Sequence, residues 1–261
     1  MSSNIHHAAA GGYATAAATY VKGRPDYPPA VSAWLKDSLG LGPGATVLDL
    51  GAGTGKFTPR LLDTGATVIA VEPVPAMLAT LSAALLQVRA LAGTATAIPL
   101  PDASIDAVVC AQAFHWFATP EALDEILRVL KPGGRLGLVW NLRDASVPWV
   151  ARLDAIVNRA EGDTPRYYTG AWRQVFPHAG LTPLQETQFS HEHTGTAEDV
   201  LFNRVRSTSF IAALPPQERQ RIDDEIRQLV DSEPALRGRD SISVPYRTAA
   251  FVAQKAAAAG I

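Results

Sequence analysis

The chain has 261 residues, 47% of them hydrophobic and 18% charged, which is enough apolar content for a full core and excludes a wholly disordered protein. Its 23 basic and 25 acidic side chains give a formal charge of −2, which argues against a nucleic-acid partner, because such proteins usually carry a basic surplus. The single cysteine, Cys110, excludes an intrachain disulfide and a cysteine zinc cluster. The sequence shows neither a signal-peptide pattern nor an apolar run of roughly 18 residues, so we expect a cytoplasmic protein with no membrane partner.

The first half of the chain alternates strand-like with helix-like segments. Short apolar runs predict strands over residues 46–50, 67–71, 105–111 and 136–140. The spacing of apolar residues between them predicts helices over residues 55–63, 75–86 and 121–130. This alternation with short connections is typical of βαβ units, and therefore of a parallel sheet with helices on both faces.

The second half of the chain is mainly helical in pattern. Apolar spacing predicts helices over residues 147–161, 196–214 and 216–231. Strand-like patterns occur near residues 180–189 and 242–252. No Pro/Gly/Ser-rich linker divides the chain, so we interpret this half as a helical cap plus the last strands of the same sheet.

A glycine-rich turn stands between the first predicted strand and the helix that follows it. The segment reads VLDLGAGTGKF over residues 47–57. Glycines permit sharp backbone dihedrals and let a ligand lie against the main chain. Since open α/β sheets bind ligands at the carboxyl ends of their strands, this turn is a candidate ligand-binding loop.

Two kinds of ligand compete for this loop. A dinucleotide fold expects G-x-G-x-x-G with a pyrophosphate at the helix N-terminus, but here the third glycine comes one position early. Asp49, two residues before the first glycine, would repel a pyrophosphate. It would suit a ligand with an ammonium and a sulfonium group and no phosphate, such as S-adenosylmethionine. An NAD(P)-dependent oxidoreductase remains the alternative, and a nonenzymatic S-adenosylmethionine-binding protein is a second one.

Glu72 ends the second predicted strand. A carboxylate at that place can accept hydrogen bonds from both ribose hydroxyls of an adenosine. Dinucleotide folds share this feature, so Glu72 supports adenosine binding but does not discriminate between S-adenosylmethionine and NAD(P).

Four stretches, taken together, resemble the class I S-adenosylmethionine-dependent methyltransferases. They read VLDLGAGTGKFT, VIAVEPVPAML, LPDASIDAVVCAQAFHWF and RVLKPGGRLGLVWN. They are most similar to the small-molecule group called methyltransferase type 11, and the match covers residues 20–143. The segments YVKGRPDYP and WNLRD also resemble parts of trans-aconitate methyltransferase-like proteins.

The resemblance implies an α/β fold with a Rossmann-like, seven-stranded, mostly parallel sheet, helices on both faces, a final antiparallel strand and a helical cap in the C-terminal half. We expect a single methyltransferase domain over residues 1–261. Residues 20–143 would form its cofactor-binding core, roughly 144–240 the cap helices and a sixth strand, and 241–255 the last strand. The implied activity is methyl transfer from S-adenosylmethionine to an oxygen, nitrogen or carbon of a small-molecule acceptor.

The resemblance also assigns roles around the methionine part of the cofactor. The loop residues Gly51, Ala52 and Gly53 would lie against it, and Asp49 would receive its ammonium, directly or through water. Ala111 and Gln112, which follow the fourth strand, would face it as well. Tyr20 and Arg24 could close over its carboxylate, since arginine is suited to bidentate carboxylate binding.

The adenosine end of the cofactor is assigned in the same way. Glu72 would hold the ribose, with Pro73 beside the adenine and Met77 under the ring. The family often has an acid that bonds the adenine amino group, and this chain has Thr94 in that place. The backbone N–H of Thr94 or Ala95 could meet the adenine edge instead.

His115 is the candidate catalytic residue, because it follows the fourth strand where the acceptor should approach. Methyl transfer is an attack on an already activated methyl group, so the protein mainly supplies position and a dry site. A hydroxyl acceptor needs a base, whereas a carboxylate acceptor does not. His115 could accept a proton, bond the acceptor or simply pack in its aromatic turn. No cluster of His, Asp and Glu has metal-ligand spacing, so we expect no metal.

Overall fold

The structure is a computed structural model that describes residues 24–256. Its strands are β1 (Thr46–Leu50), β2 (Thr67–Glu72), β3 (Arg89–Ala92), β4 (Ile105–Ala111), β5 (Leu130–Arg143), β6 (Gln185–Gly195) and β7 (Ile242–Gln254). The longer helices are α3 (Ala30–Leu39), α5 (Pro75–Ala84), α6 (Pro120–Val129), α7 (Pro148–Asn158) and α10 (Pro216–Ser232). The shorter helical segments are α4 (Thr58–Leu62), η1 (Phe114–Trp116), η2 (Ala171–Val175), η3 (Glu198–Asn203), α8 (Arg204–Arg206) and α9 (Ser209–Ala212).

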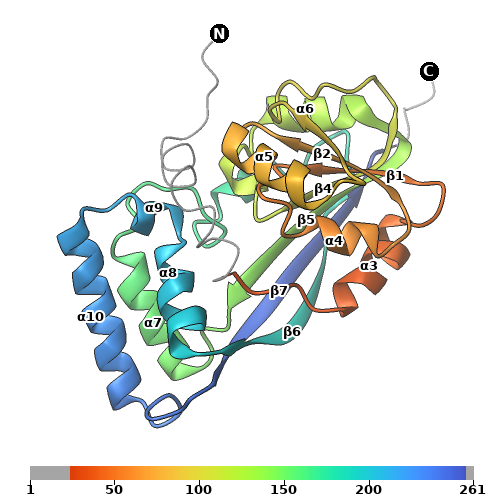
Figure 1. Ribbon diagram of the computed structural model, residues 1–261. Coiled ribbons are helices and arrows are strands. Elements are labelled where there is room, and N and C mark those ends of the chain that lie inside the picture. Colours follow the sequence, from red (N-terminus) through yellow and green to blue (C-terminus); the bar gives the residue numbers. More distant parts are fainter. Residues whose placement is uncertain (1–23, 257–261) are drawn as a thin grey trace.

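All seven strands form one sheet in the order β3-β2-β1-β4-β5-β7-β6 (Figure 1). The pairs from β3 through β5 are parallel, whereas β7 is antiparallel to both β5 and β6. This confirms the predicted α/β fold with a Rossmann-like, mostly parallel, seven-stranded sheet. The carboxyl ends of β1, β2 and β4 therefore meet at one edge of the sheet, where parallel α/β folds place their ligands.

Alternate residues of the central strands pack into two cores on opposite faces of the sheet, as the period of a strand requires. Leu48 of β1 belongs to a first core that α6 and Trp172 of η2 cover. Val47, its neighbour, belongs to a second core that α3, α4 and α5 cover. Both side chains are fully buried, which explains why neighbouring residues of β1 are apolar instead of alternating with polar ones.

A third core lies at the far end of the long strands, where α7, α8, α9 and α10 gather (Figure 1). The apolar sides of these helices pack with η3 and with the first residues of β7, which include Ile242 and Tyr246. Along α10, Ile222, Ile226 and Leu229 form the buried stripe that their spacing predicts. We call these helices the cap.

Some element boundaries differ from the sequence-based expectation. The helix expected over residues 196–214 is divided into η3, α8 and α9. η3 is a π-helical segment that continues directly into α8, and Thr208, which takes an extended conformation with ψ 128°, separates α8 from α9. β6 begins at Gln185 rather than near residue 180, after Pro183, which has no N–H for a sheet. The elements α3 and β3 were not predicted.

Candidate cofactor and acceptor site

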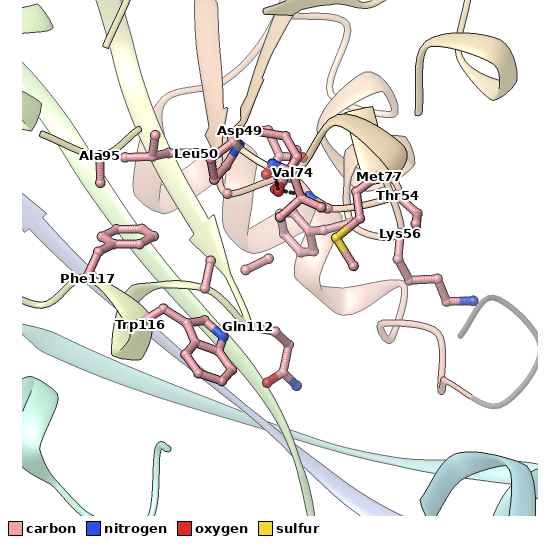
Figure 2. Close-up of a pocket in the computed structure, with 18 of the residues that line it drawn as sticks. Asp49, Leu50, Thr54, Lys56, Val74, Met77, Ala95, Gln112, Trp116 and Phe117 are labelled. Carbon is pink, nitrogen blue, oxygen red and sulfur yellow. Dashed lines mark hydrogen bonds between the residues drawn. The ribbon is translucent and has the colours of Figure 1, made fainter. Parts of the chain in front are cut away.

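A cavity of about 960 Å³ opens at the carboxyl ends of β1, β2 and β4. Figure 2 shows Asp49 and Val74 on one side of it, across from Trp116 and Gln112. The structure places along its wall every predicted cofactor residue that it describes, namely Arg24, Asp49, Gly51, Ala52, Gly53, Glu72, Pro73, Met77, Thr94, Ala95, Ala111 and Gln112. The remaining predicted residue, Tyr20, lies outside the described residues.

The glycine loop needs glycine at particular positions. Gly51 has φ 72° and Gly53 has φ 59°, which is the left-handed region that side chains disfavour. A Cβ added to Gly51 would lie 2.8 Å from the Cβ of Ala113, so the loop also passes too close to its neighbour for a side chain. The N–H groups of Gly51 and Ala52 donate to the carbonyl of Val71 at 2.8 and 3.2 Å, which ties the loop to β2.

Asp49 presents a buried carboxylate at this cavity. Its Oδ2 accepts a hydrogen bond of 2.7 Å from the hydroxyl of Thr58, while its Oδ1 is buried and has no hydrogen-bond partner among residues 24–256. Burial raises the pKa of Asp49 to about 7, and the charge of Glu72 adds to the increase, although the Thr58 hydrogen bond opposes it. An orphaned carboxylate oxygen fits a cationic group such as an ammonium.

Glu72 is held by two backbone donors. Its Oε2 accepts from the N–H of Gly53 at 2.8 Å, and its Oε1 accepts from the N–H of Val74 at 2.9 Å. Each oxygen keeps a second lone pair, so the fixed carboxylate can still accept hydrogen bonds from a ligand. Burial raises the pKa of Glu72, and the two backbone hydrogen bonds work against that change.

The predicted adenine end is lined by small and apolar groups. Met77 is buried and lies beside the loop, since a Cβ on Gly53 would lie 3.9 Å from its Sδ (Figure 2). The carbonyl of Thr94 accepts from the N–H of Ala97 at 3.2 Å, which closes a turn at the cavity wall. Ala95 in this turn is buried. Such a surface fits the flat face of an aromatic ring.

Gln112 is fixed in an unusual conformation at the end of β4. Its φ is 55°, a left-handed value that residues other than glycine seldom adopt. Its N–H donates to the carbonyl of Val139 at 2.8 Å, and its Nε2 donates to the carbonyl of Asn141 at 2.8 Å. Strain of this kind persists only where the surroundings fix it, and it is common at functional sites.

A smaller cavity of about 80 Å³ adjoins the larger one. The two share the lining residues Arg24, Gln112, Trp116, Asn141 and Arg204. Since a water molecule takes up about 30 Å³ in the liquid, the smaller cavity holds a group of a few heavy atoms. A ligand in it would lie next to one in the larger cavity.

His115 lines the smaller cavity. Its Nδ1 accepts a hydrogen bond of 3.0 Å from the indole Nε1 of Trp140. Burial, together with the charges of Arg166 and Arg24, lowers the pKa of His115 to about 3. The ring is therefore neutral near pH 7 and carries its proton on Nε2, so the geometry favours the hydrogen-bonding role over the role of proton acceptor.

The smaller cavity is lined by Arg143 of β5, by Arg166 of the loop that follows α7, and by Arg204 of α8. Sequence reasoning named Arg204 among cap side chains that could line an acceptor pocket, and it gave no role to Arg143 or Arg166. The sequence did contain a signal for Arg143. It is a charged residue at the end of an apolar strand, and such a residue is either exposed to solvent or buried with a partner of opposite charge. The other two reach the cavity only through the packing of the cap, which sequence spacing does not reveal.

Comparisons with known proteins agree with this geometry. The methyltransferase domain family matches residues 48–138. An uncharacterized methyltransferase-like protein of Schizosaccharomyces pombe is 40% identical over 244 residues, which is 93% of this chain and 95% of the relative. An uncharacterized methyltransferase of Mycobacterium tuberculosis is 43% identical over 236 residues, covering 90% and 92% of the two chains.

Among solved structures, a proposed type II methyltransferase from Anaeromyxobacter dehalogenans shares the fold, with a TM-score of 0.63 at 24% identity. That likeness covers 89% of this chain and 97% of the other. The family match and the two relatives, together with the fold and the glycine loop, show that the chain belongs to the class I S-adenosylmethionine-dependent methyltransferases. It is a methyltransferase rather than an oxidoreductase, whereas the narrower likeness to trans-aconitate methyltransferase-like proteins stays a prediction.

Within residues 24–256 no helix has the length and apolar character that crossing a membrane requires. In the same part of the chain no three His, Cys, Asp or Glu side chains gather in a way that could hold a metal ion.

Proposed function

We propose that the enzyme binds S-adenosylmethionine in the larger cavity and transfers its methyl group to an oxygen, nitrogen or carbon atom of a small molecule that extends into the adjoining smaller cavity. The orphaned Oδ1 of Asp49 carries this proposal, because a buried carboxylate oxygen without a hydrogen-bond partner among residues 24–256 favours a cationic ligand group. When bound, the cofactor supplies a methyl group that its sulfonium charge has already activated.

The residues of the chain would act mainly by binding and orienting. Asp49 would hold the ammonium of the methionine part, and Glu72 would accept hydrogen bonds from the ribose. Gln112, which lines both cavities, would stand where donor and acceptor meet. Fixed placement of this kind lowers the barrier of a reaction between two molecules. The translational and rotational entropy that the reactants must give up is already lost when they bind, so it no longer adds to the barrier of the chemical step.

The test compares ligands and one conservative variant. We expect calorimetry to show binding of S-adenosylmethionine and S-adenosylhomocysteine, and no binding of NAD or NADP. Asp49→Asn keeps the size of the side chain but removes its charge, so it should weaken binding of both ligands. Asp63→Asn removes a charge from a half-exposed side chain outside both cavities and is the matched control.

Turnover is measured separately, with cofactor labelled in its methyl group and a panel of small acids, phenols and amines read by mass spectrometry. Label in a product supports the proposal. Tight binding of NAD with no response to S-adenosylmethionine contradicts it, and so does a folded Asp49→Asn protein with unchanged affinity.

A further inference from the structure

The charges around the smaller cavity are of one sign. Four arginines line it, namely Arg24, Arg143, Arg166 and Arg204. No described Asp or Glu is part of its lining. Most surfaces mix the two signs, so a small cavity bordered by four guanidinium groups is a site that favours an anion.

Two of these arginines have acidic partners behind the cavity wall. The Nε and Nη2 of Arg143 each lie 2.6 Å from Oδ1 of Asp154, and both side chains are buried. The Nη1 of Arg143 is also buried but has no hydrogen-bond partner among residues 24–256. Arg166 donates from Nη1 to Glu161 at 3.1 Å and to Asn158 at 2.8 Å. The guanidinium group of Arg143 is therefore held by Asp154 through Nε and Nη2, while its Nη1 remains as an unused donor within the described chain.

Arg204 is not neutralised in this way. In the part of the chain that the structure describes, no carboxylate forms an ion pair with it, and its Nη1 donates only to the hydroxyl of Thr208 at 3.2 Å. Its Nε is buried without a partner. Burial, followed by the charges of Arg24 and Arg143, lowers the pKa of Arg204 to about 10, although Tyr246 opposes this change. Gathering these charges is unfavourable, and a bound anion would offset the cost.

We propose that the smaller cavity binds a carboxylate of the methyl acceptor, with Arg204 and Arg143 as its anchor, so that the substrates of this enzyme are small organic acids. The planar fork of a guanidinium matches the two oxygens of a carboxylate. The ring N–H of His115 adds a neutral donor to the same cavity. This inference rests on the proposed function, since it names the acceptor of the same reaction.

The anchoring carboxylate is not the group that receives the methyl. Oxygens that accept hydrogen bonds from guanidinium groups have their lone pairs engaged and are weaker nucleophiles. The reacting atom belongs near Gln112 and Trp116, which both cavities share. There an electron pair of the acceptor forms the new bond to the methyl carbon, and the electron pair of the broken carbon–sulfur bond stays on sulfur. This pair is a lone pair on oxygen or nitrogen, or the π pair of an enolate or electron-rich ring when carbon is methylated. A proton that the acceptor atom carries is released to solvent.

Binding is tested first, in the complex with S-adenosylhomocysteine, so that turnover is not needed. The probes are succinate, glutarate, benzoate and para-hydroxybenzoate, each compared with its carboxamide by ligand-observed NMR. The carboxamide keeps the skeleton and removes the charge. We expect at least one acid to bind about tenfold or more tightly than its amide, the ratio that corresponds to about 1.4 kcal/mol.

Arg204→Gln should abolish this acid-over-amide preference, and Arg204→Lys should keep part of it, because lysine keeps the charge without the fork. Arg227→Gln is the matched control, since Arg227 is half-exposed on α10 and lines neither cavity. The ratio is the informative quantity. A variant that merely loosens the cavity would weaken acid and amide alike.

The outcomes separate the two proposals. Equal binding of acids and amides overturns the inference, as does an Arg204→Gln protein with the wild-type preference. Tighter binding of phosphate monoesters than of acids also overturns it, in favour of a different anion. Failure of S-adenosylhomocysteine to bind in the first place contradicts the proposed function instead.

Discussion

The indole N–H of Trp140 points at Nδ1 of His115, with a donor–acceptor distance of 3.0 Å. Trp140 is fully buried, and its ring centre lies 4.5 Å from that of Trp172, so the donor is fixed. A histidine nitrogen that accepts a hydrogen bond carries no proton, and the neutral ring then has its proton on Nε2. Trp140 thereby makes His115 a hydrogen-bond donor toward the smaller cavity.

This relationship predicts the pH dependence of turnover. A ring with a pKa of about 3 stays neutral, so the rate should show no titration of His115 between about pH 5 and 9, a range around the ordinary value of about 6.5. His115→Ala should lower the rate while leaving cofactor affinity within a few-fold. His115→Asn should retain much of the activity, because its amide can still donate. A rate that rises through about pH 6.5 and loses this rise in His115→Asn would show a general base.

Asp49 should make cofactor affinity depend on pH. An ammonium binds the ionised carboxylate, and the pKa of Asp49 in the free protein is raised to about 7. Below that pH the carboxyl group must lose a proton before it binds, so affinity should fall by up to about tenfold per pH unit as the pH decreases. Calorimetry with S-adenosylhomocysteine at several pH values checks this. Asp49→Asn should remove the pH dependence, and a wild-type affinity that is flat with pH would refute the assignment.

Glu72 should contribute both to the stability of the protein and to its affinity for the cofactor. Glu72→Ala leaves the N–H groups of Gly53 and Val74 without their acceptor, and we expect a loss of about 1–3 kcal/mol in the free energy of unfolding. Affinity for S-adenosylhomocysteine should weaken about tenfold or more, because charge-assisted hydrogen bonds to the ribose are worth roughly 1.5–3 kcal/mol each. Urea unfolding and calorimetry measure the two effects. Unchanged affinity in folded Glu72→Ala would argue against a ribose contact.

Two glycines form a matched pair for testing the loop. Gly44 has φ 91° and open space around it, whereas Gly51 has φ 72° and Ala113 in the way. Gly44→Ala should therefore cost only the backbone strain, about 1–2 kcal/mol. Gly51→Ala should cost more, since the loop must also move, and it should weaken cofactor binding while Gly44→Ala does not. Equal effects of the two substitutions on affinity would show that the loop is not part of the cofactor site.

The fold could be predicted where a strand is buried on both faces. β1, β2 and β4 consist mainly of apolar residues, which fill the first and second cores alternately. β3 could not be found, because its four residues, Arg-Ala-Leu-Ala, carry no β-branched side chain and become a strand only by pairing with β2. For α3 a signal existed, since Val31, Leu35 and Leu39 repeat at helical spacing.

The candidate site also has a part that could be predicted from the sequence and a part that could not. Its larger cavity could be predicted, because strand order brings the ends of β1, β2 and β4 together and the glycine loop is a local pattern. The smaller cavity could not, because Arg166 and Arg204 are far apart in the sequence and meet only through the packing of the cap. The protonation of His115 could not be predicted either, since it depends on a contact with Trp140 of the neighbouring strand β5.

β7 belongs to all three cores at once. Its first residues, Ile242 and Tyr246 among them, pack in the third core, while its later residues Ala250 and Phe251 pack in the second and the first. The strand also pairs with β5 and β6 along most of its length, so none of these cores can lose its order without breaking hydrogen bonds that the others require. The cap and the sheet should consequently melt as one cooperative unit, with a single calorimetric transition whose van't Hoff and calorimetric enthalpies agree.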